Sequence, residues 1–258
     1  MVFSYFRKYM VAPILFSVKD PQMASYIPVW YGTNITVNDT ERTDDALFDP
    51  GDSFSALNRY LMHNIKCDPR FFVFHGGVLE KNGSAYVFLA DSGMGKSTLM
   101  AYLSQQGWSY INDDYVIISK GRRSVIPDDY PIHLRIGGLE YLRHEGIVVN
   151  PDAYIPYQYS ENKRENGKYV VKLSSCNNLE LSVKGIFMLD RKPENEGKQR
   201  FSKESFNIVI KRLLTASLHA YSLDKEVVVF MNSLIDKCYS LYYTNASDVI
   251  SLMEEFER

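Results

Sequence analysis

Cysteine is scarce in this chain of 258 residues, which holds only Cys67, Cys176 and Cys238. The number is odd and no two of them form a CxxC pair, so the sequence offers neither a disulfide framework nor a thiolate metal site. Charge of one sign is also lacking, because 29 basic residues face 31 acidic ones, for a formal net charge of −2. This balance gives no electrostatic reason to expect nucleic acid as the main partner.

Long apolar runs are lacking as well. No run approaches the length of a membrane-spanning helix, so we expect no membrane partner. The N-terminal run MVAPILFSV is short, is interrupted by Pro13 and is followed by no clean cleavage site, so we expect no signal peptide. What the chain does have is ordinary globular composition, with 45% hydrophobic and 23% charged residues. We therefore expect a cytoplasmic protein with reduced, structural thiols.

The apolar pattern predicts an α/β fold with two parts. Residues 1–65 alternate short apolar runs with turn-rich stretches, which predicts an N-terminal lobe of strands, loops and one helix near Phe54 to Asn64. Residues 66–258 are expected to form the catalytic domain. Within it, residues 120–180 are rich in loop-forming residues.

From Arg70 onward the pattern is sharper. FFVFHGGVLE is predicted as one strand that pairs through the KNGS turn with AYVFLA, and WSYIN and YVIIS are predicted as two further strands. GKSTLMAYLSQQG is predicted as a helix that ends at Gly107. Later in the chain the pattern predicts a strand at LSVKGIFMLD, a core helix at SFNIVIKRLLTASLH, a strand at YSLYY and a terminal helix at SDVISLMEEFE.

A phosphate-binding loop is the strongest motif. The residues that form it and open the following helix are Asp91, Ser92, Gly93, Met94, Gly95, Lys96, Ser97 and Thr98, and Ala90 stands where the motif asks for glycine. Gly93 and Gly95 allow backbone angles that direct N–H groups toward one anion, and the helix N-terminus favours negative charge. We expect Lys96 to contact the β- and γ-phosphates of ATP, and Ser97 to bind Mg²⁺.

Two carboxylates and a histidine accompany the loop. Asp113 and Asp114 follow the predicted helix and a short strand, which is expected to place them on the neighbouring strand end, close to the loop. One carboxylate is suited to holding Mg²⁺ and the other to accepting a proton from an attacking hydroxyl. The alternative is an ordinary Asp-Asp turn. His75 is expected at the end of the strand that pairs with the loop's own strand, where a histidine is able to orient a phosphate or a carboxylate.

The order His-Gly, hairpin, phosphate loop, helix and Asp-Asp resembles the HPr serine kinase family and its shorter relatives. Those relatives include kinases encoded with ribosomally made peptides such as lasso peptides. The segments that carry the resemblance are FHGGVLEKNGSAYVFLADSGMGKST and GWSYINDDYVII. The resemblance implies a mixed-sheet core like that of phosphoenolpyruvate carboxykinases. It implies Lys96 and Ser97 as phosphate and Mg²⁺ ligands, Asp113 as the metal-side partner, Asp114 as the catalytic carboxylate and His75 as the active-site histidine.

Further along, YPIHLRIGG resembles the Pro-x-x-x-Arg segment of the shorter relatives. Arg135 is therefore a candidate for neutralising charge on the transferred phosphoryl group, or else a solvated arginine at a strand end. Thr98 stands where HPr kinases proper usually carry Glu, and residues 1–65 do not resemble their N-terminal domain. The peptide-tailoring relatives fit the length and layout better.

These observations predict an ATP- and Mg²⁺-dependent kinase that phosphorylates a serine of a peptide or small protein, such as a ribosomally made precursor. One alternative keeps the kinase chemistry with a small-molecule or nucleic-acid hydroxyl as acceptor. Another is a nucleotide-binding regulator without phosphotransfer. No motif identifies the acceptor, the preferred donor or the oligomeric state, and a homo-oligomer remains open.

Overall fold

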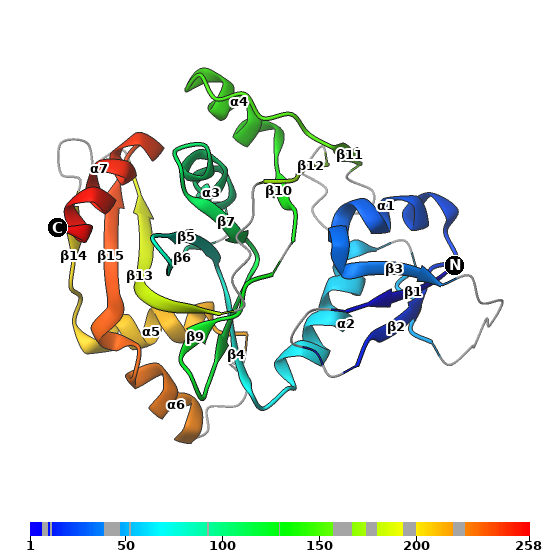
Figure 1. Ribbon diagram of the computed structural model, residues 1–258, viewed down its shortest axis with the longest axis horizontal. Helices are drawn as coiled ribbons and strands as arrows, with labels where there is room; N and C mark the ends of the chain where they lie inside the picture. Colours follow the sequence, from blue (N-terminus) through cyan, green and yellow to red (C-terminus); the bar gives the residue numbers. More distant parts are fainter. Residues whose placement is uncertain are drawn as a thin grey trace. The chain divides into compact units, whose positions relative to one another are not determined.

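The structure, a computed structural model, describes residues 1–6, 10, 12–38, 47–51, 53–91, 93–128, 130–156, 167–173, 180–192, 200–218 and 225–258 (Figure 1). The chain divides into two compact units, and each unit is built from two stretches of the sequence. The first unit takes Met1–Pro69 and Asp128–Leu173, and the second takes Arg70–Pro127 and Ser174–Arg258. This division differs from the expected boundary at residue 65, because residues 128–173 belong with the N-terminal part.

The first unit contains two small antiparallel sheets, ordered β2-β1-β3 and β10-β12-β11. Its strands are β1 (Val2–Tyr5), β2 (Ile14–Ser17), β3 (Ile35–Asn38), β10 (Ile132–Leu134), β11 (Ala153–Ile155) and β12 (Lys168–Val171). Its helices are α1 (Pro21–Tyr31), α2 (Phe54–Lys66) and α4 (Ile136–His144), with a 3-10 turn η1 (Gly32–Asn34). The predicted helix near Phe54 is confirmed as α2.

Helix α1 was not predicted, because its sequence PQMASYIPVWY includes an internal proline, Pro28. Asp20 caps its N-terminus by accepting a hydrogen bond from the Met23 backbone N–H at 2.6 Å. Met23, Ile27 and Trp30 are buried and recur at helical spacing, so they form the inward face of α1. Helix α4 likewise lies in the stretch that was predicted to be mainly loop.

Residues 128–173 join the first unit through buried aromatic contacts. His133 on β10 stacks on Trp30 with ring centroids 4.0 Å apart, and its Nε2 lies 3.2 Å from the Trp30 carbonyl oxygen. Tyr130 meets Tyr31 edge-on at 5.9 Å. These contacts bring residues about a hundred positions apart into one core, and for this reason no local pattern predicted the division.

Among the described residues, the second unit holds a mixed sheet of nine strands. Its strands are β4 (Phe71–His75), β5 (Gly77–Lys81), β6 (Ser84–Leu89), β7 (Ser109–Asn112), β8 (Tyr115–Ser119), β9 (Ser124–Val125), β13 (Leu181–Arg191), β14 (Arg200–Ser202) and β15 (Cys238–Tyr243). Its helices are α3 (Lys96–Ser104), α5 (Phe206–Ala216), α6 (Lys225–Asn232) and α7 (Ala246–Glu257), with a 3-10 turn η4 (Ile235–Lys237). The main path runs β4-β8-β9-β13-β6-β5-β7, and β15 joins β13 to β14. Strands β6, β13 and β15 are parallel, so their carboxyl ends lie at one edge.

The sheet curls, because strands far apart in this order are joined by very short connections. Gly76 alone connects β4 to β5, and only Asp113 and Asp114 connect β7 to β8. The two joints meet, since the Gly76 N–H donates to the Asp114 carbonyl at 3.4 Å. A Cβ on Gly76 would lie 2.6 Å from Leu89 Cδ2 and 3.0 Å from the Phe88 carbonyl oxygen, so this closure requires glycine.

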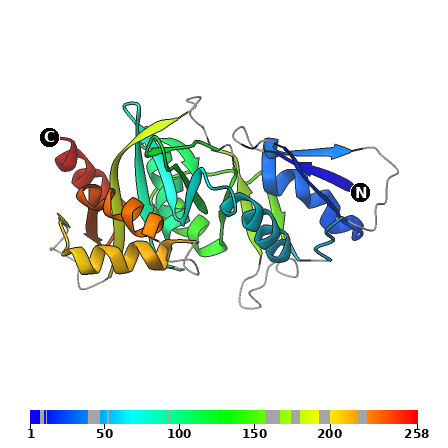
Figure 2. The same ribbon diagram turned by 90° about the horizontal axis from the view of Figure 1, so that it is seen from below.

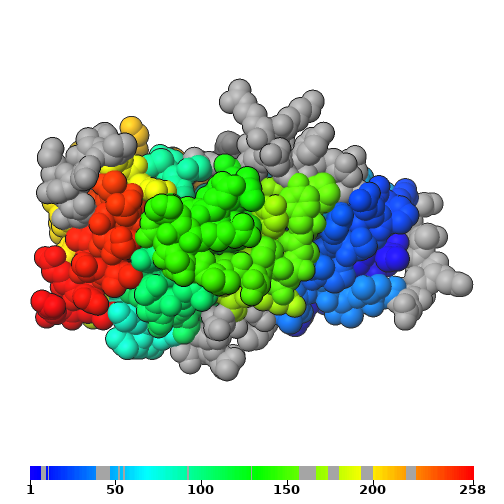
Figure 3. All heavy atoms as spheres, turned by 90° about the horizontal axis from the view of Figure 1, so that it is seen from above, coloured from blue at the N-terminus to red at the C-terminus, as the bar shows by residue number. Residues whose placement is uncertain are grey.

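Helices cover both faces of the sheet in the second unit. Helices α5 and α6 pack on one face, and α3 and α7 pack on the other (Figure 2). The residues of β6 alternate accordingly: Val87 joins the α5–α6 core, whereas Phe88 stacks on Phe187 at 5.6 Å on the opposite side. Helix α7 buries Val249 and Met253 and turns its polar side to the molecular surface, where it is drawn in red (Figure 3).

Most predicted elements of this unit are present, namely the β5–β6 hairpin, α3, β7, β8, β13, α5, β15 and α7. One strand prediction is wrong, because FFVFHGGVLE forms two strands that are interrupted at Gly76, and α6 was not predicted. Of the three cysteines, Cys67 is an exposed free thiol and Cys238 a buried one, and Cys176 lies outside the described residues. No helix in the described ranges combines the length and the hydropathy needed to cross a membrane.

Candidate functional site

The loop between β6 and α3 has the backbone geometry of an anion site. Gly93 has a φ of 86° and Gly95 a φ of 80°, and Gly95 is the N-cap of α3. Glycine adopts such angles without steric cost. The Gly95 carbonyl accepts the first helical hydrogen bond, from the Leu99 N–H at 2.9 Å. The N–H groups at the start of α3 therefore lie at the loop, where the helix dipole favours an anion.

The other loop residues are placed by the same turn. The Met94 N–H donates to the Asp91 carbonyl at 3.3 Å. Asp91 is exposed, whereas Met94, Ser97 and Thr98 are half-buried. Ser92, which was predicted to contact a nucleotide, lies outside the described residues.

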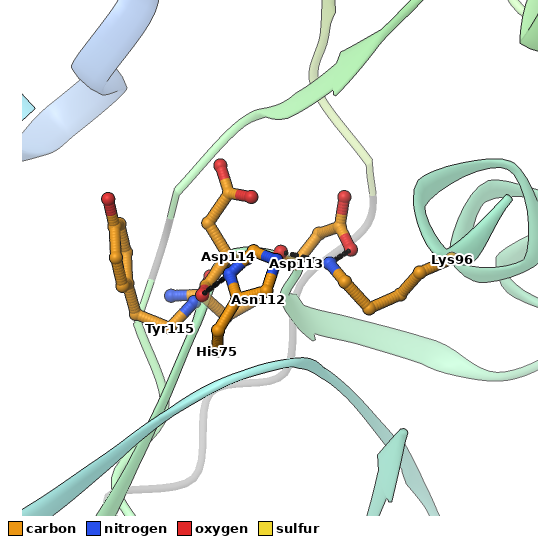
Figure 4. Close-up of polar contacts among 6 residues, drawn as sticks. All are labelled: His75, Lys96, Asn112, Asp113, Asp114 and Tyr115. Atoms are coloured by element: carbon orange, nitrogen blue, oxygen red, sulfur yellow. Dashed lines mark hydrogen bonds and ion pairs between the residues drawn. The ribbon is translucent and has the colours of Figure 1, made fainter. Parts of the chain in front are cut away.

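Lys96 connects the loop to the carboxylate pair. Its side chain is buried, with 7% of it exposed, and its Nζ donates to the Asp113 carbonyl oxygen at 2.7 Å and forms an ion pair with the Asp113 carboxylate (Figure 4). The pairing explains how a lysine is accommodated in the interior, because a buried charge needs a partner. The phosphate loop and the Asp-Asp segment therefore form one site.

The strand arrangement behind this contact differs from the expected one. The strand that ends at Asn112, β7, pairs with β5 and not with β6, so the carboxylates are not on the strand next to the loop's own strand. Lys96 reaches Asp113 because α3 packs over β5. A Cβ on Gly77 of β5 would lie 2.7 Å from Met100 Sδ and 3.4 Å from Asp113 Oδ1, so glycine lets α3 approach closely.

Opposing effects act on the Asp113 carboxyl. Burial raises the pKa of Asp113 above its usual range and the neighbouring Asp114 charge adds to the rise, whereas the Lys96 ammonium opposes it. The nearby Ser97 hydroxyl also lowers the pKa of this carboxyl. The two side chains predicted to bind Mg²⁺, Ser97 and Asp113, are therefore neighbours.

Asn112 shapes the turn that presents the two aspartates, a role that was not predicted. Its buried side-chain Oδ1 accepts hydrogen bonds from the Asp114 N–H at 3.1 Å and the Tyr115 N–H at 3.3 Å. Asparagine commonly closes a turn in this way, so the Asn-Asp-Asp sequence carried a usable signal. In Figure 4 the carboxylates of Asp113 and Asp114 point to the same side of the turn.

His75 contacts the same turn from the end of β4. This strand pairs with β8, not with β6 as expected, and His75 is opposite Tyr115 in the register. The His75 Nδ1 lies 3.1 Å from the Asp114 carbonyl oxygen. Since a carbonyl only accepts, Nδ1 carries the proton that His75 donates in this contact. His75 thus supports the backbone of Asp114.

Arg135 does not belong to the unit that holds the phosphate loop and the two aspartates. It belongs to the first unit, where it is exposed and occupies the N-cap position of α4. Its contribution to phosphoryl transfer stays a prediction.

The residues present are chemically suited to a nucleotide with Mg²⁺. Two positive-φ glycines, a helix N-terminus and a lysine suit phosphate, and a hydroxyl beside a carboxylate suits a magnesium ion that also binds phosphate oxygens. The described residues contain no group of three or more His, Cys, Asp or Glu side chains able to hold a metal ion. Magnesium bound through phosphates does not require such a group, since one or two carboxylates are its usual protein ligands.

Comparison with known proteins yields no match in sequence and a distant likeness in structure. No family model matches the chain, and no curated protein matches it. Among solved structures it is similar to the Hpr(Ser) kinase/phosphatase from Coxiella burnetii, with 10% identity and a TM-score of 0.34 over 72% of this chain and 90% of that one. A score this low does not establish a shared fold. Membership of the HPr kinase family therefore stays a prediction from the sequence motifs.

Proposed function

We propose that this protein is a kinase that transfers a phosphoryl group from ATP, with Mg²⁺, to a serine hydroxyl of a peptide or protein. The observation that carries the proposal is the buried contact between Lys96 of the phosphate loop and Asp113 of the Asp-Asp turn. A phosphate-binding element and a pair of carboxylates at one place are the parts that phosphoryl transfer needs for positioning and charge neutralisation.

Lys96 has two roles in this proposal. Without a nucleotide it neutralises Asp113, and with one it turns to the phosphates. Asp113 would then hold Mg²⁺ together with Ser97, whose hydroxyl lies near this carboxylate. The exchange keeps every buried charge paired, which avoids the cost of an isolated ion in the interior.

Asp114 is the proposed base toward the substrate hydroxyl. Its carboxylate is half-buried and lies beside that of Asp113, while Asn112 holds its backbone N–H and His75 contacts its carbonyl (Figure 4). These two contacts hold the backbone of Asp114 in place. They therefore favour a defined position of its carboxylate for accepting a proton. His75 acts in this scheme by positioning Asp114.

The acceptor is proposed from the motif resemblance and not from the geometry. The segments FHGGVLEKNGSAYVFLADSGMGKST and GWSYINDDYVII resemble serine kinases that act on peptides or proteins. A precursor peptide encoded near this chain is the first candidate, and Arg135 is proposed to meet the transferred phosphoryl group.

The test is the mass of candidate peptides after incubation with the protein, ATP and Mg²⁺. A gain of one phosphate on a serine is expected with the native protein, and no gain with Lys96→Ala or Asp114→Asn. If native protein binds ATP and yet modifies no peptide, a small-molecule acceptor or a regulatory role replaces this proposal. If native protein binds no ATP, the whole proposal is wrong.

A further inference from the structure

Arg191 lies against the phosphate loop, although no sequence motif drew attention to it. It is the last residue of β13, the parallel neighbour of the strand that leads into the loop. A Cβ built on Gly95 would lie 3.0 Å from Arg191 Nη1, so the guanidinium is in close contact with the N-cap of α3. The guanidinium therefore stands where the helix N-terminus already favours an anion.

The arginine is held in this position by the sheet. Its Nε donates to the Thr244 carbonyl oxygen at 3.0 Å, and Thr244 follows β15, the other parallel neighbour of β13. The three parallel strands β6, β13 and β15 therefore bring the loop, the arginine and its anchor to one edge. Binding sites of sheets with parallel strands commonly lie at this carboxyl edge.

The negative charge of a bound nucleotide would favour a second cation at the loop. A nucleoside triphosphate brings several negative charges, and Lys96, the cation within the loop, is paired with Asp113 in this structure. A guanidinium binds phosphate with two parallel N–H donors and stays charged at all relevant pH values. The next residue, Lys192, is paired with Asp190 at 3.3 Å.

We propose that Arg191 binds the phosphates of the nucleotide as a second cation beside Lys96. This inference rests on the proposed function, because it assumes that the loop binds a nucleotide. It adds a phosphate ligand from β13, anchored through Thr244, to the residues of the loop itself. Gly95 also leaves room for this arrangement, since a Cβ there would lie 3.0 Å from Arg191 Nη1 and the guanidinium would have to shift by a few tenths of an ångström.

The experiment compares ATP–Mg²⁺ affinity, by calorimetry, among the native protein, Arg191→Met, Arg191→Lys and the matched control Lys192→Met. Methionine preserves length without charge, and lysine preserves charge without the fork. Arg191→Met is expected to bind ATP about tenfold or more weakly, the size of a charge-assisted hydrogen bond, with Arg191→Lys between it and native protein. Lys192→Met is expected to bind like native protein. Tripolyphosphate should lose affinity by the same factor as ATP, since the base is not involved.

Three results would overturn the inference. The first is native-like ATP affinity in Arg191→Met. The second is equal weakening of ATP affinity in Arg191→Met and Arg191→Lys, which would indicate that packing and not charge is lost. A chemical test on the native protein is independent of how the variants fold: ATP–Mg²⁺ should protect Arg191 from phenylglyoxal and leave exposed Arg200 reactive. Absence of that protection, in protein shown to bind ATP, is the third. Native protein that binds no ATP overturns the proposed function itself.

Discussion

Individual glycines decide the geometry of the candidate site. Gly76 permits the joint between β4 and β5, Gly77 permits the approach of α3, and Gly95 combines a positive φ with the contact to Arg191. The loop glycines could be predicted, because the phosphate-loop motif requires them. The FHGG glycines were read as part of a continuous strand, since their role depends on atoms from Leu89 and Met100 that are distant in sequence.

Gly95→Ala should separate the effect of the positive φ at Gly95 from the effect of its contact with Arg191. Alanine at a φ of 80° is expected to lower the free energy of unfolding by about 1–2 kcal/mol. Gly107→Ala is the matched control, because its φ is 85° and a Cβ there meets nothing within 4 Å. We expect similar losses of stability in urea unfolding for both variants, and a loss of ATP affinity for Gly95→Ala alone. Equal ATP affinity in the two variants would contradict the assigned geometry.

At the scale of elements, strands and helices with regular periodicity were predicted and their pairing was not. Helices α5 and α7 show apolar residues at helical spacing, α3 follows directly from the phosphate-loop motif, and β7 and β8 are short apolar runs beside turn residues. Helix α1 was missed because of Pro28. That β4 pairs with β8 and β5 with β7 follows from the curl at Gly76, which is a tertiary feature.

Glu204, just after the edge strand β14, makes a hydrogen bond that should make the free energy of unfolding depend on pH. Glu204 accepts a hydrogen bond from Tyr242 Oη at 2.7 Å, which holds the pKa of Glu204 below its usual range. A carboxylate with a lowered pKa contributes stability above its unfolded pKa and loses it as the pH falls through the folded value. Urea unfolding between about pH 6 and about pH 3 should therefore show a steeper loss for native protein than for Glu204→Gln.

Glu254→Gln serves as the control for this comparison, since Glu254 is exposed on α7 and the charge change is the same. Its profile should follow that of the native protein. A Glu204→Gln profile parallel to the native one would show that the Tyr242 contact does not contribute.

For the whole molecule, the division into two units from four stretches of chain is the feature that the sequence did not predict. A continuous boundary was expected at residue 65, and the apolar composition of residues 128–173 gives no sign that they join the N-terminal stretch. The contacts that unite them are long-range: the His133 ring stacks on the Trp30 ring, and its Nε2 lies within hydrogen-bonding distance of the Trp30 backbone carbonyl.

Trp30→Ala tests this division by hydrogen–deuterium exchange. Removing a buried aromatic side chain typically costs about 3–5 kcal/mol. We expect faster amide exchange in β10 and β12, which share the first unit with Trp30. Trp108→Ala, a change at a buried tryptophan of the second unit, should leave those two strands unaffected. Unchanged exchange of β10 and β12 in Trp30→Ala would contradict the unit assignment.

The central claim is that Lys96, Asp113 and Asp114 form one site for phosphoryl transfer. The most direct test measures ATP affinity and the rate of peptide phosphorylation in Asp114→Asn beside the native protein. Loss of the base should slow transfer by about 10²-fold to 10⁴-fold while ATP affinity stays close to native. Undiminished phosphorylation by Asp114→Asn would show that this carboxylate takes no part in the reaction and would contradict the proposed mechanism.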